Sequence, residues 1–350
     1  MVIGAIILTG ASLTASVLIV QMAVLPLMFR YSKTVQRKMV FSNCINYPKH
    51  MDFTNPASCN VLGGRSFNVQ FVSKVDNCPI KLGGWHIAPR SVFRDILSVN
   101  DSQTFCDRLQ ESLKATENPI VLYCHGNSNH RGSPHRLQMY KVFQDLNFHV
   151  ITFDYRGYGD STYVRPTERG VVEDALNVYT WLMNAVGTRK KPMVILWGHS
   201  LAIASNLVAN LEELCRSTGT CLPQPDALVL EAPFNNLVDE IEKHPFSKIV
   251  SWLPYYKDYF VKPFSSSSEY AFTTDQYLSK AKDIPLLILH SKGDKIVPYK
   301  LAVKLHDCIA ESRVSGGAPL QFQMFDRGHN DLCEAPELPD VIRNFLKCVK

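Results

Sequence analysis

The sequence predicts an α/β fold with a mostly parallel, doubly wound sheet, and three observations support it. Short apolar runs, each about as long as a buried parallel strand, recur along the chain at residues 120–124, 148–153, 193–197, 227–231 and 285–290. Helix-length segments separate most of these runs, and their apolar residues recur at helical spacing, for example Val171, Ala175, Val178 and Leu182. Strands that alternate with helices form parallel sheets. The third observation is a sharp strand-to-helix junction around Ser200.

Residues 1–29 predict a transmembrane anchor. They contain no charged side chain and are rich in Ile, Leu, Val and Ala, and about 20 such residues span the core of a bilayer. A cleaved signal peptide is the alternative, but no basic residue precedes the apolar run. We therefore expect a membrane bilayer as a partner, a juxtamembrane segment at residues 30–66 and the main α/β domain at 67–350.

The orientation of this anchor stays open. The basic residues that follow it would, by the positive-inside rule, leave the main domain in the cytosol; they are Arg30, Lys33, Arg37 and Lys38. Two features favour a lumenal domain instead: a glycosylation sequon at Asn100 and ten cysteines, which is a high number for a cytosolic protein. The four basic residues account for most of the net charge of +5, so nucleic acid is not an expected partner.

One insertion interrupts the alternation of strands and helices. Residues 234–280 are longer than a crossover helix requires, and a long excursion at the carboxyl end of a strand is typical of a lid over an active site. An ordinary pair of packing helices is the alternative, because aromatic residues usually belong to a core. The insertion holds many of them: Trp252, Tyr255, Tyr256, Tyr259, Phe260, Phe264 and Phe272.

The junction at residues 197–202 reads Trp-Gly-His-Ser-Leu-Ala, which predicts a nucleophile elbow. Such a turn holds Ser200 in a strained backbone conformation, so that its hydroxyl projects from the end of the strand. Small flanking residues let the strand and the helix approach each other. Gly198 meets this need, whereas Ala202 stands where the motif usually has glycine. Because the short pattern is common by chance, the rest of the constellation has to support it.

A serine hydroxyl needs a base within hydrogen-bond reach, and in such folds the acid and the histidine follow it along the chain. Asp294 comes after the strand candidate 286–289, and His329 follows Gly328 after the strand candidate 320–325. We predict these two residues as the acid and the base of a triad with Ser200. The alternatives are Glu231 for the acid and His290 or His306 for the base; the two histidines are more typical of structural roles.

Two backbone amides are expected to stabilise the oxyanion. Leu201 follows the nucleophile at a helix N-terminus, and Asn127 follows the His125-Gly126 pair after the first clear strand. Evenly spaced histidines at 125, 130 and 135 have no carboxylate beside them, so we predict no metal site. No cofactor is required for this chemistry.

These motifs, together with Asp-Tyr-Arg-Gly-Tyr-Gly at residues 154–159, resemble those of α/β-hydrolases. More narrowly, the chain is similar to the family of α/β-hydrolase domain-containing protein 12, lipases of lysophosphatidylserine and monoacylglycerols. The segments that favour this family are Glu-Arg-Gly at 168–170, His-Pro-Phe-Ser at 244–247 and Pro-Glu-Leu-Pro at 336–339. The resemblance implies a serine hydrolase of the endoplasmic reticulum membrane with a lumenal catalytic domain.

The sequence therefore predicts a membrane-anchored hydrolase that cleaves acyl esters of single-chain lipids. Arg131 and Arg156, near the oxyanion loop, are candidates for the lipid head group, and Trp252 in the insertion is a candidate for the lipid itself. A protein depalmitoylase or thioesterase and a peptidase are alternatives. A catalytically silent binding protein is a further alternative, which Ala202 alone supports.

Overall fold

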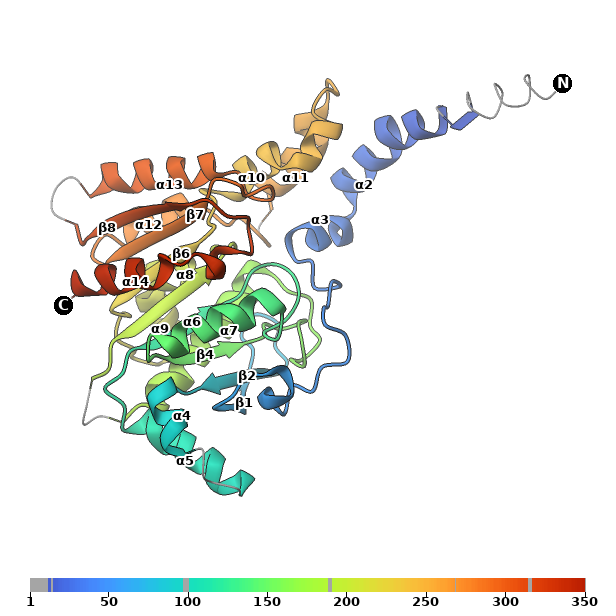
Figure 1. The fold of residues 1–350 in the computed structure, drawn as a ribbon. Helices are drawn as coiled ribbons and strands as arrows, with labels where there is room; N and C mark the ends of the chain where they lie inside the picture. Colours follow the sequence, from blue (N-terminus) through green and yellow to red (C-terminus); the bar gives the residue numbers. More distant parts are fainter. Residues whose placement is uncertain are drawn as a thin grey trace.

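The computed structural model describes residues 12–13, 15–96, 101–187, 191–267, 269–313 and 317–349. An eight-stranded sheet in the order β1-β2-β4-β3-β5-β6-β7-β8 runs through the molecule (Figure 1). The strands β1 and β2 form an antiparallel hairpin that pairs antiparallel with β4, and the other pairings are parallel. Their bounds are β1 (Gly64–Val72), β2 (Pro79–Ile87), β3 (Ile120–Cys124), β4 (His149–Phe153), β5 (Val194–His199), β6 (Ala227–Glu231), β7 (Leu286–Ser291) and β8 (Leu320–Phe325).

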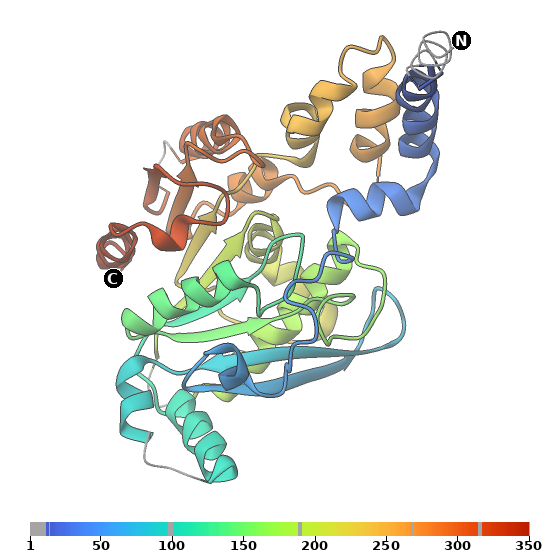
Figure 2. The ribbon, with the colours of Figure 1, turned by 45° about the vertical axis from the view of Figure 1, so that its right-hand side comes forward.

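Helices cover both faces of this sheet, as Figures 1 and 2 show. One face packs against α7 (Glu168–Ala185), α8 (Ile203–Ala209), α9 (Leu211–Thr218), α12 (Thr274–Lys280) and α13 (Tyr299–Ser312). The other face packs against α6 (Pro134–Asp145) and α14 (Leu338–Lys347). The strands β3 to β7 are buried along their whole length, which is why continuous apolar runs predicted them. The remaining short elements of the body are η2 (Pro56–Cys59), α4 (Arg90–Ile96), α5 (Ser102–Lys114) and η5 (Leu332–Glu334).

The strand β2 is not one of the continuous apolar runs of the sequence. Glycines weaken a strand pattern, and β2 contains Gly83 and Gly84. A Cβ atom at Gly83 would lie 2.1 Å from the Asp160 carboxylate, and one at Gly84 would lie 2.4 Å from the Phe67 ring. The glycines therefore serve close packing across the strand, which the pattern of apolar residues cannot reveal.

Two segments far apart in the sequence project together from the body (Figures 1 and 2). The first holds η1 (Val20–Val24), α2 (Leu25–Tyr31) and α3 (Lys33–Val40); the second, from the insertion, holds α10 (Leu237–Lys243), η3 (Pro245–Ile249), η4 (Lys257–Val261) and α11 (Lys262–Ser265). The Phe29 ring centroid lies 4.8 Å from that of Phe260 and 5.8 Å from that of Phe246. We call residues 15–31 and 246–265 together the apolar arm.

Within the described part of the chain, no single helix is long and apolar enough to cross a membrane. The helices Ala15–Tyr31 and Lys33–Val40 meet that requirement only as a pair, and they are bent by 87° at their junction. The first eleven residues of the predicted anchor lie outside the described residues, as does the predicted glycosylation site at Asn100.

Candidate active site

The strand β5 passes into α8 through a strained turn at Ser200. The φ angle of Ser200 is 62°, a left-handed conformation that a residue with a side chain seldom adopts. Two hydrogen bonds fix the turn: the Ser200 amide donates to the Glu231 carbonyl at 2.8 Å, and the Leu201 amide donates to the His199 carbonyl at 2.7 Å. The backbone at this position has the geometry that the elbow motif predicts.

Small residues make the turn possible. A Cβ atom at Gly198 would lie only 2.8 Å from the Cβ of Ala204, so the strand could not approach the helix with any larger residue. The loop after β3 is less tightly packed, because a Cβ atom at Gly126 would lie at an ordinary contact distance of 3.4 Å from the Cβ of Ser200. Ala202 is buried in the apolar core, so its methyl group fits the site where the motif usually has glycine.

Asp294 and His329 form a direct hydrogen bond at the carboxyl ends of β7 and β8. Oδ2 of Asp294 accepts from Nδ1 of His329 at 2.6 Å, and the side chains are 0% and 9% exposed. The amides of Ile296 and Val297 both donate to Oδ1 at 2.8 Å, and Nε2 of His290 lies 3.3 Å from Oδ2. Burial pushes the pKa of Asp294 upward, but the hydrogen bonds from His290 and His329 outweigh it and hold this pKa well below its usual range. The carboxylate is therefore ionised and orients the imidazole.

The serine and the Asp–His pair are neighbours without a hydrogen bond between them. Among the described residues, no hydrogen bond joins Oγ of Ser200 to His329. The ring of His199, the residue before Ser200, lies 5.3 Å from the ring of His329. The serine turn is therefore close to the Asp294–His329 pair. In enzymes without substrate such bonds are often long and shorten when substrate binds. The arrangement therefore leaves His329 Nε2 available to the serine.

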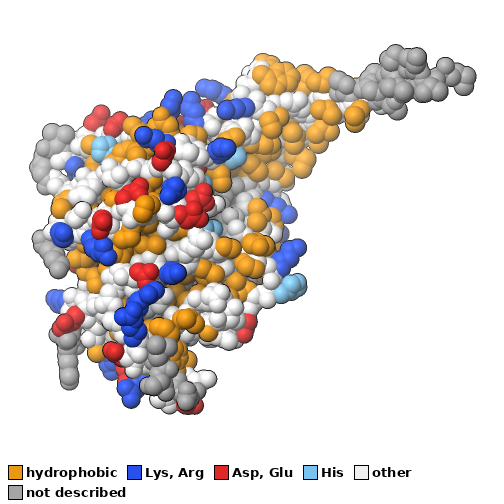
Figure 3. Space-filling view, in the orientation of Figure 1, with side chains coloured by type: hydrophobic (Ala, Val, Ile, Leu, Met, Phe, Trp, Pro, Cys, Tyr) orange, Lys and Arg blue, Asp and Glu red, His pale blue; other side chains and the backbone are white. Residues whose placement is uncertain are grey.

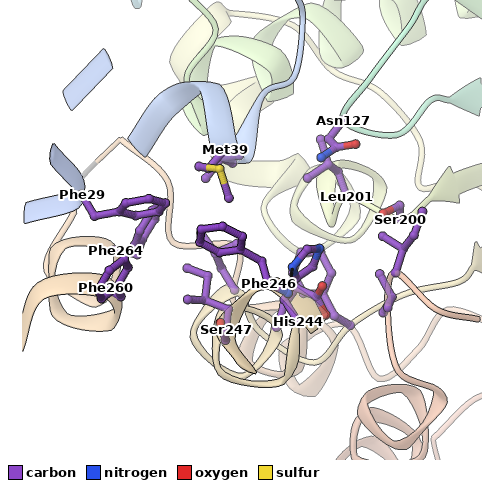
Figure 4. A pocket seen from close by; sticks show the side chains of 17 residues that line it. Phe29, Met39, Asn127, Ser200, Leu201, His244, Phe246, Ser247, Phe260 and Phe264 are labelled. Atoms are coloured by element: carbon purple, nitrogen blue, oxygen red, sulfur yellow. Dashed lines mark hydrogen bonds between the residues drawn. The ribbon is translucent and has the colours of Figure 1, made fainter. Parts of the chain in front are cut away.

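An apolar pocket opens at Ser200 (Figure 4). Asn127 and Leu201, the two predicted oxyanion residues, line it beside the serine, whereas phenylalanines gather at the end away from it. Unexpectedly, the segment before the main domain supplies part of the wall. The apolar and aromatic residues that complete it come from that segment, from the insertion and from the Asp294 loop: Phe29, Met39, Val40, Phe234, Leu237, Ile241, Phe246, Phe260, Phe264, Ile296 and Val297.

Glu240 is a polar residue of this pocket that sequence reasoning missed. It lines the pocket, is only 8% exposed, and its Oε2 atom has no hydrogen-bond partner among the described residues. Burial, with a smaller contribution from the charge of Asp294, raises the pKa of Glu240 to about 8. Its carboxyl group is therefore mostly protonated at neutral pH. Acidic and basic residues surround it in α10, a composition typical of a solvent-exposed helix, so no sequence signal indicated this burial.

The three predicted substrate contacts do not line this pocket. Arg131 is buried against Asp154 and lies 2.6 Å from Asp160. Arg156 is buried as well, against Glu173 and Asp174. Trp252 is 54% exposed at the tip of the insertion. Both guanidinium groups thus hold the turn after β4, and the tryptophan faces outward.

The alternative acid and bases occupy other positions. Glu231 accepts a hydrogen bond from Nε1 of Trp197 at 2.8 Å, and burial raises its pKa to about 7. His290 is fully buried against Asp294, where it supports the acid. His306 lies on α13 beside Asp307. Only His329 combines the contact to Asp294 with a position next to the serine turn.

Comparison with known proteins places this geometry in a family. Residues 119–236 match the family model of the α/β-hydrolase fold. The lysophosphatidylserine lipase ABHD12 of Danio rerio is 36% identical over 329 residues, covering 92% of this chain and 80% of the relative. The same lipase of Rattus norvegicus is 37% identical, covering 92% and 76%. Protein ABHD12B of Homo sapiens is 35% identical over 76% of this chain and 69% of its own length.

Solved structures support the fold. An esterase of Pyrococcus furiosus, Pf2001, superposes with a TM-score of 0.56 and 17% sequence identity, covering 87% of this chain and 96% of its own. An α/β-hydrolase of Vibrio vulnificus superposes with a TM-score of 0.57 and 16% identity, covering 90% and 92%. The chain belongs to the α/β-hydrolases and, within them, to the family of the ABHD12 lipases, as its motifs predicted.

Proposed function

We propose that this protein is a membrane-anchored serine hydrolase that cleaves the acyl ester of single-chain lipids, namely lysophospholipids such as lysophosphatidylserine, and monoacylglycerols. One observation carries the proposal: a strained serine turn opens on an apolar pocket lined by phenylalanines, and the loop that holds the buried Asp–His pair supplies another part of the pocket wall. The curated relatives are named lysophosphatidylserine lipases, which supports lysophosphatidylserine as a substrate.

In this proposal the reaction follows the two-step course of serine hydrolases. Nε2 of His329 takes the proton of the Ser200 hydroxyl as Oγ attacks the acyl carbonyl. The amides of Asn127 and Leu201 stabilise the negative charge that develops on the carbonyl oxygen; the Leu201 amide, which donates to the His199 carbonyl in the free enzyme, turns from that carbonyl to the oxyanion. Asp294 stabilises the imidazolium. His329 then protonates the departing alcohol. A water molecule, deprotonated by the same histidine, hydrolyses the acyl-enzyme and restores the serine.

Activity-based labelling tests the proposal. A fluorophosphonate probe should label the wild type and a Ser205→Ala control, whose serine is buried on α8, but not Ser200→Ala. The purified enzymes should then be compared on lysophosphatidylserine, other lysophospholipids, a monoacylglycerol and an S-palmitoylated peptide. Turnover of the lipids that depends on Ser200 supports the proposal. Turnover of the thioester alone would indicate a depalmitoylase, and a folded wild type that is neither labelled nor active would indicate a silent binding protein.

We further propose that the protein resides in the endoplasmic reticulum membrane with its catalytic domain in the lumen. The glycosylation sequon at Asn100 supports the lumenal orientation. The ten cysteines do not add to the argument, because all ten are unpaired. Digestion with an endoglycosidase tests the orientation: the wild type should lose mass and an Asn100→Gln variant should not. Equal mobility of both proteins before digestion would contradict a glycosylated Asn100.

A further inference from the structure

We propose that the tip of the insertion, residues 249–252, lies in the bilayer interface beside the N-terminal helix, and that the lipid substrate enters the pocket from the bilayer between these two segments. This inference rests on the membrane anchor of the proposed function. It adds a second membrane contact, made by the lid itself, and a route for the substrate.

The tip exposes large apolar side chains that nothing in the described structure covers. Ile249 is 51% exposed and Trp252 is 54% exposed. Tryptophan is typical of the interface between a bilayer and water, where its ring meets the head groups. Lys248, Lys257 and Lys262 are exposed on the same segment, and long basic side chains of this kind extend toward lipid head groups while their stems cover apolar surface. Lys257 and Lys262 also lie 3.9 and 3.7 Å from the carboxylates of Glu242 and Asp258. The apolar and amphipathic side chains of the tip therefore match the interface of a bilayer without requiring anionic lipid.

The tip is fastened to the helix that the sequence assigns to the membrane. The side chain of Gln21 donates a hydrogen bond to the carbonyl of Ile249, and the hydroxyl of Tyr255 donates to the carbonyl of Met22. The helix exposes a row of apolar side chains beside these contacts, including Val17, Leu18, Ile19, Val20 and Met22. Figure 3 shows the arm as a projection covered mainly by hydrophobic side chains. A bilayer that surrounds this helix would therefore also contact the tip of the insertion.

The arm also connects the tip to the serine. Phe29 from the helix and Phe246 and Phe260 from the insertion pack against one another, and all three line the pocket that reaches Ser200. An acyl chain that entered between the two segments, past the contacts of Phe29, would meet mainly apolar side chains on its way to the serine. Exposure of the chain to water would be unfavourable, and more so for each additional methylene group. Entry along the arm avoids that cost.

Quenching of tryptophan fluorescence tests the insertion of the tip. The full-length protein is reconstituted into vesicles of phosphatidylcholine and phosphatidylserine, with or without brominated acyl chains. Trp85 and Trp197 are buried in the core and Trp181 stacks on Phe67, so Trp252 is the tryptophan that can meet lipid. Brominated lipid should quench the wild type more strongly than Trp252→Phe. Equal fractional quenching of the two proteins overturns the proposal.

Kinetics test the entry route. An Ile249→Asp variant should cleave lysophospholipid in vesicles at least fivefold less efficiently, and dissolved p-nitrophenyl butyrate as fast as the wild type. Val72→Asp, which changes an exposed residue at the end of β1, should behave as the wild type on both esters. Unchanged cleavage in vesicles, or equal loss on both esters, overturns the route. If the wild type cleaves neither ester, the proposed function fails instead, and the quenching result still decides whether the tip is inserted.

Discussion

At the scale of single residues, the serine turn depends on side-chain size at two positions, Gly198 and Ala202, which differ in the space available for a methyl group. Gly198 faces Ala204 so closely that no Cβ atom fits without a shift of backbone or helix. Ala202 begins α8 with its methyl group buried in the core. The first position requires glycine, whereas the second accepts a methyl group that adds burial.

Ala202→Gly and Gly198→Ala are therefore expected to differ. The first removes one buried methyl group and should lower the free energy of unfolding by about 1 kcal/mol, with ester hydrolysis within about threefold of the wild type. The second overpacks the turn and should cost about 1–3 kcal/mol and most of the activity. Urea denaturation and esterase kinetics on the same preparations measure both effects. A loss of activity by orders of magnitude in Ala202→Gly would contradict this account.

Glu240 predicts a dependence of stability on pH. Burial raises its pKa from 4.5 to about 8, so between these values the folded protein keeps a proton that the unfolded chain has released. Stability then falls as the pH rises through this window, by on the order of 1 kcal/mol per pH unit. Glu240→Gln removes the titration, so its advantage over the wild type should grow toward pH 8. Urea denaturation at several pH values measures the difference in slope.

A neighbour on the same helix provides the control. The side chain of Glu242 is 32% exposed and lies 3.9 Å from Lys257, so Glu242→Gln should keep the pH slope of the wild type. The same slope in the wild type and in Glu240→Gln would show that the Glu240 carboxyl group is ionised in the folded protein.

The sequence predicted those residues of the proposed triad whose positions depend on local backbone geometry. Ser200, Asp294 and His329 each follow a strand whose apolar pattern is visible, and their order along the chain is part of the signal. Glu240, Phe29 and Met39 could not be found in this way, because the pocket wall forms only when three distant segments meet. Arg131 and Arg156 were predicted to contact the head group, but the structure buries them away from the pocket. Their place near the oxyanion loop is visible in the sequence, but their burial against carboxylates is not.

At the scale of elements, Arg156 joins parts of the fold that are separate in the sequence. From the turn after β4 its guanidinium reaches Asp174 and Glu173 on α7, at 2.7 and 2.8 Å, and also Asp76 in the β1–β2 turn. Removing one partner from a buried ion pair leaves the other charges unpaired. The network thus fastens the hairpin to the helix layer.

An Arg156→Met variant should consequently lose about 3–5 kcal/mol of stability, while the folded fraction keeps the preference among head groups. Arg90→Met is the matched control, because Arg90 and Asp145 form a surface pair with both side chains 47% exposed; its cost should stay below about 1 kcal/mol. Thermal unfolding and hydrolysis of lysophosphatidylserine and monoacylglycerol measure both variants. A change of head-group preference at full stability would restore the predicted role of Arg156 in binding.

The strands were predictable as elements because parallel strands covered on both faces are apolar throughout. The insertion at 234–280 was predictable from its length alone. Its packing partner was not, because neither the apolar residues 15–29 nor the basic residues that follow them indicate which surface this segment contacts. Phe29 and Arg30 illustrate this: the ring of the first packs on Phe260, and the side chain of the second donates to the Asp258 carbonyl at 2.6 Å.

At the scale of the whole molecule, the predicted anchor (residues 1–29) and the predicted juxtamembrane segment (30–66) both contribute to the pocket. Phe29 and Met39 line it from the N-terminal side, whereas Leu27 and Met28 on the same segment are 49% and 44% exposed. A double variant Phe29→Ala/Met39→Ala therefore removes pocket wall, and Leu27→Ala/Met28→Ala removes a similar amount of apolar side chain outside the pocket.

The two double variants separate anchoring from binding. Each methylene of the acyl chain that loses its apolar contact costs about 0.8 kcal/mol, so two such losses should raise KM by about tenfold in Phe29→Ala/Met39→Ala, and the effect should grow with the length of the acyl chain. The control pair should change KM for these esters in detergent by less than twofold. Monoacylglycerols of increasing chain length, assayed in detergent micelles, measure the trend without a bilayer. If both double variants raise KM equally at every chain length, the N-terminal segment acts as an anchor alone and the pocket wall at Phe29 and Met39 does not hold the acyl chain.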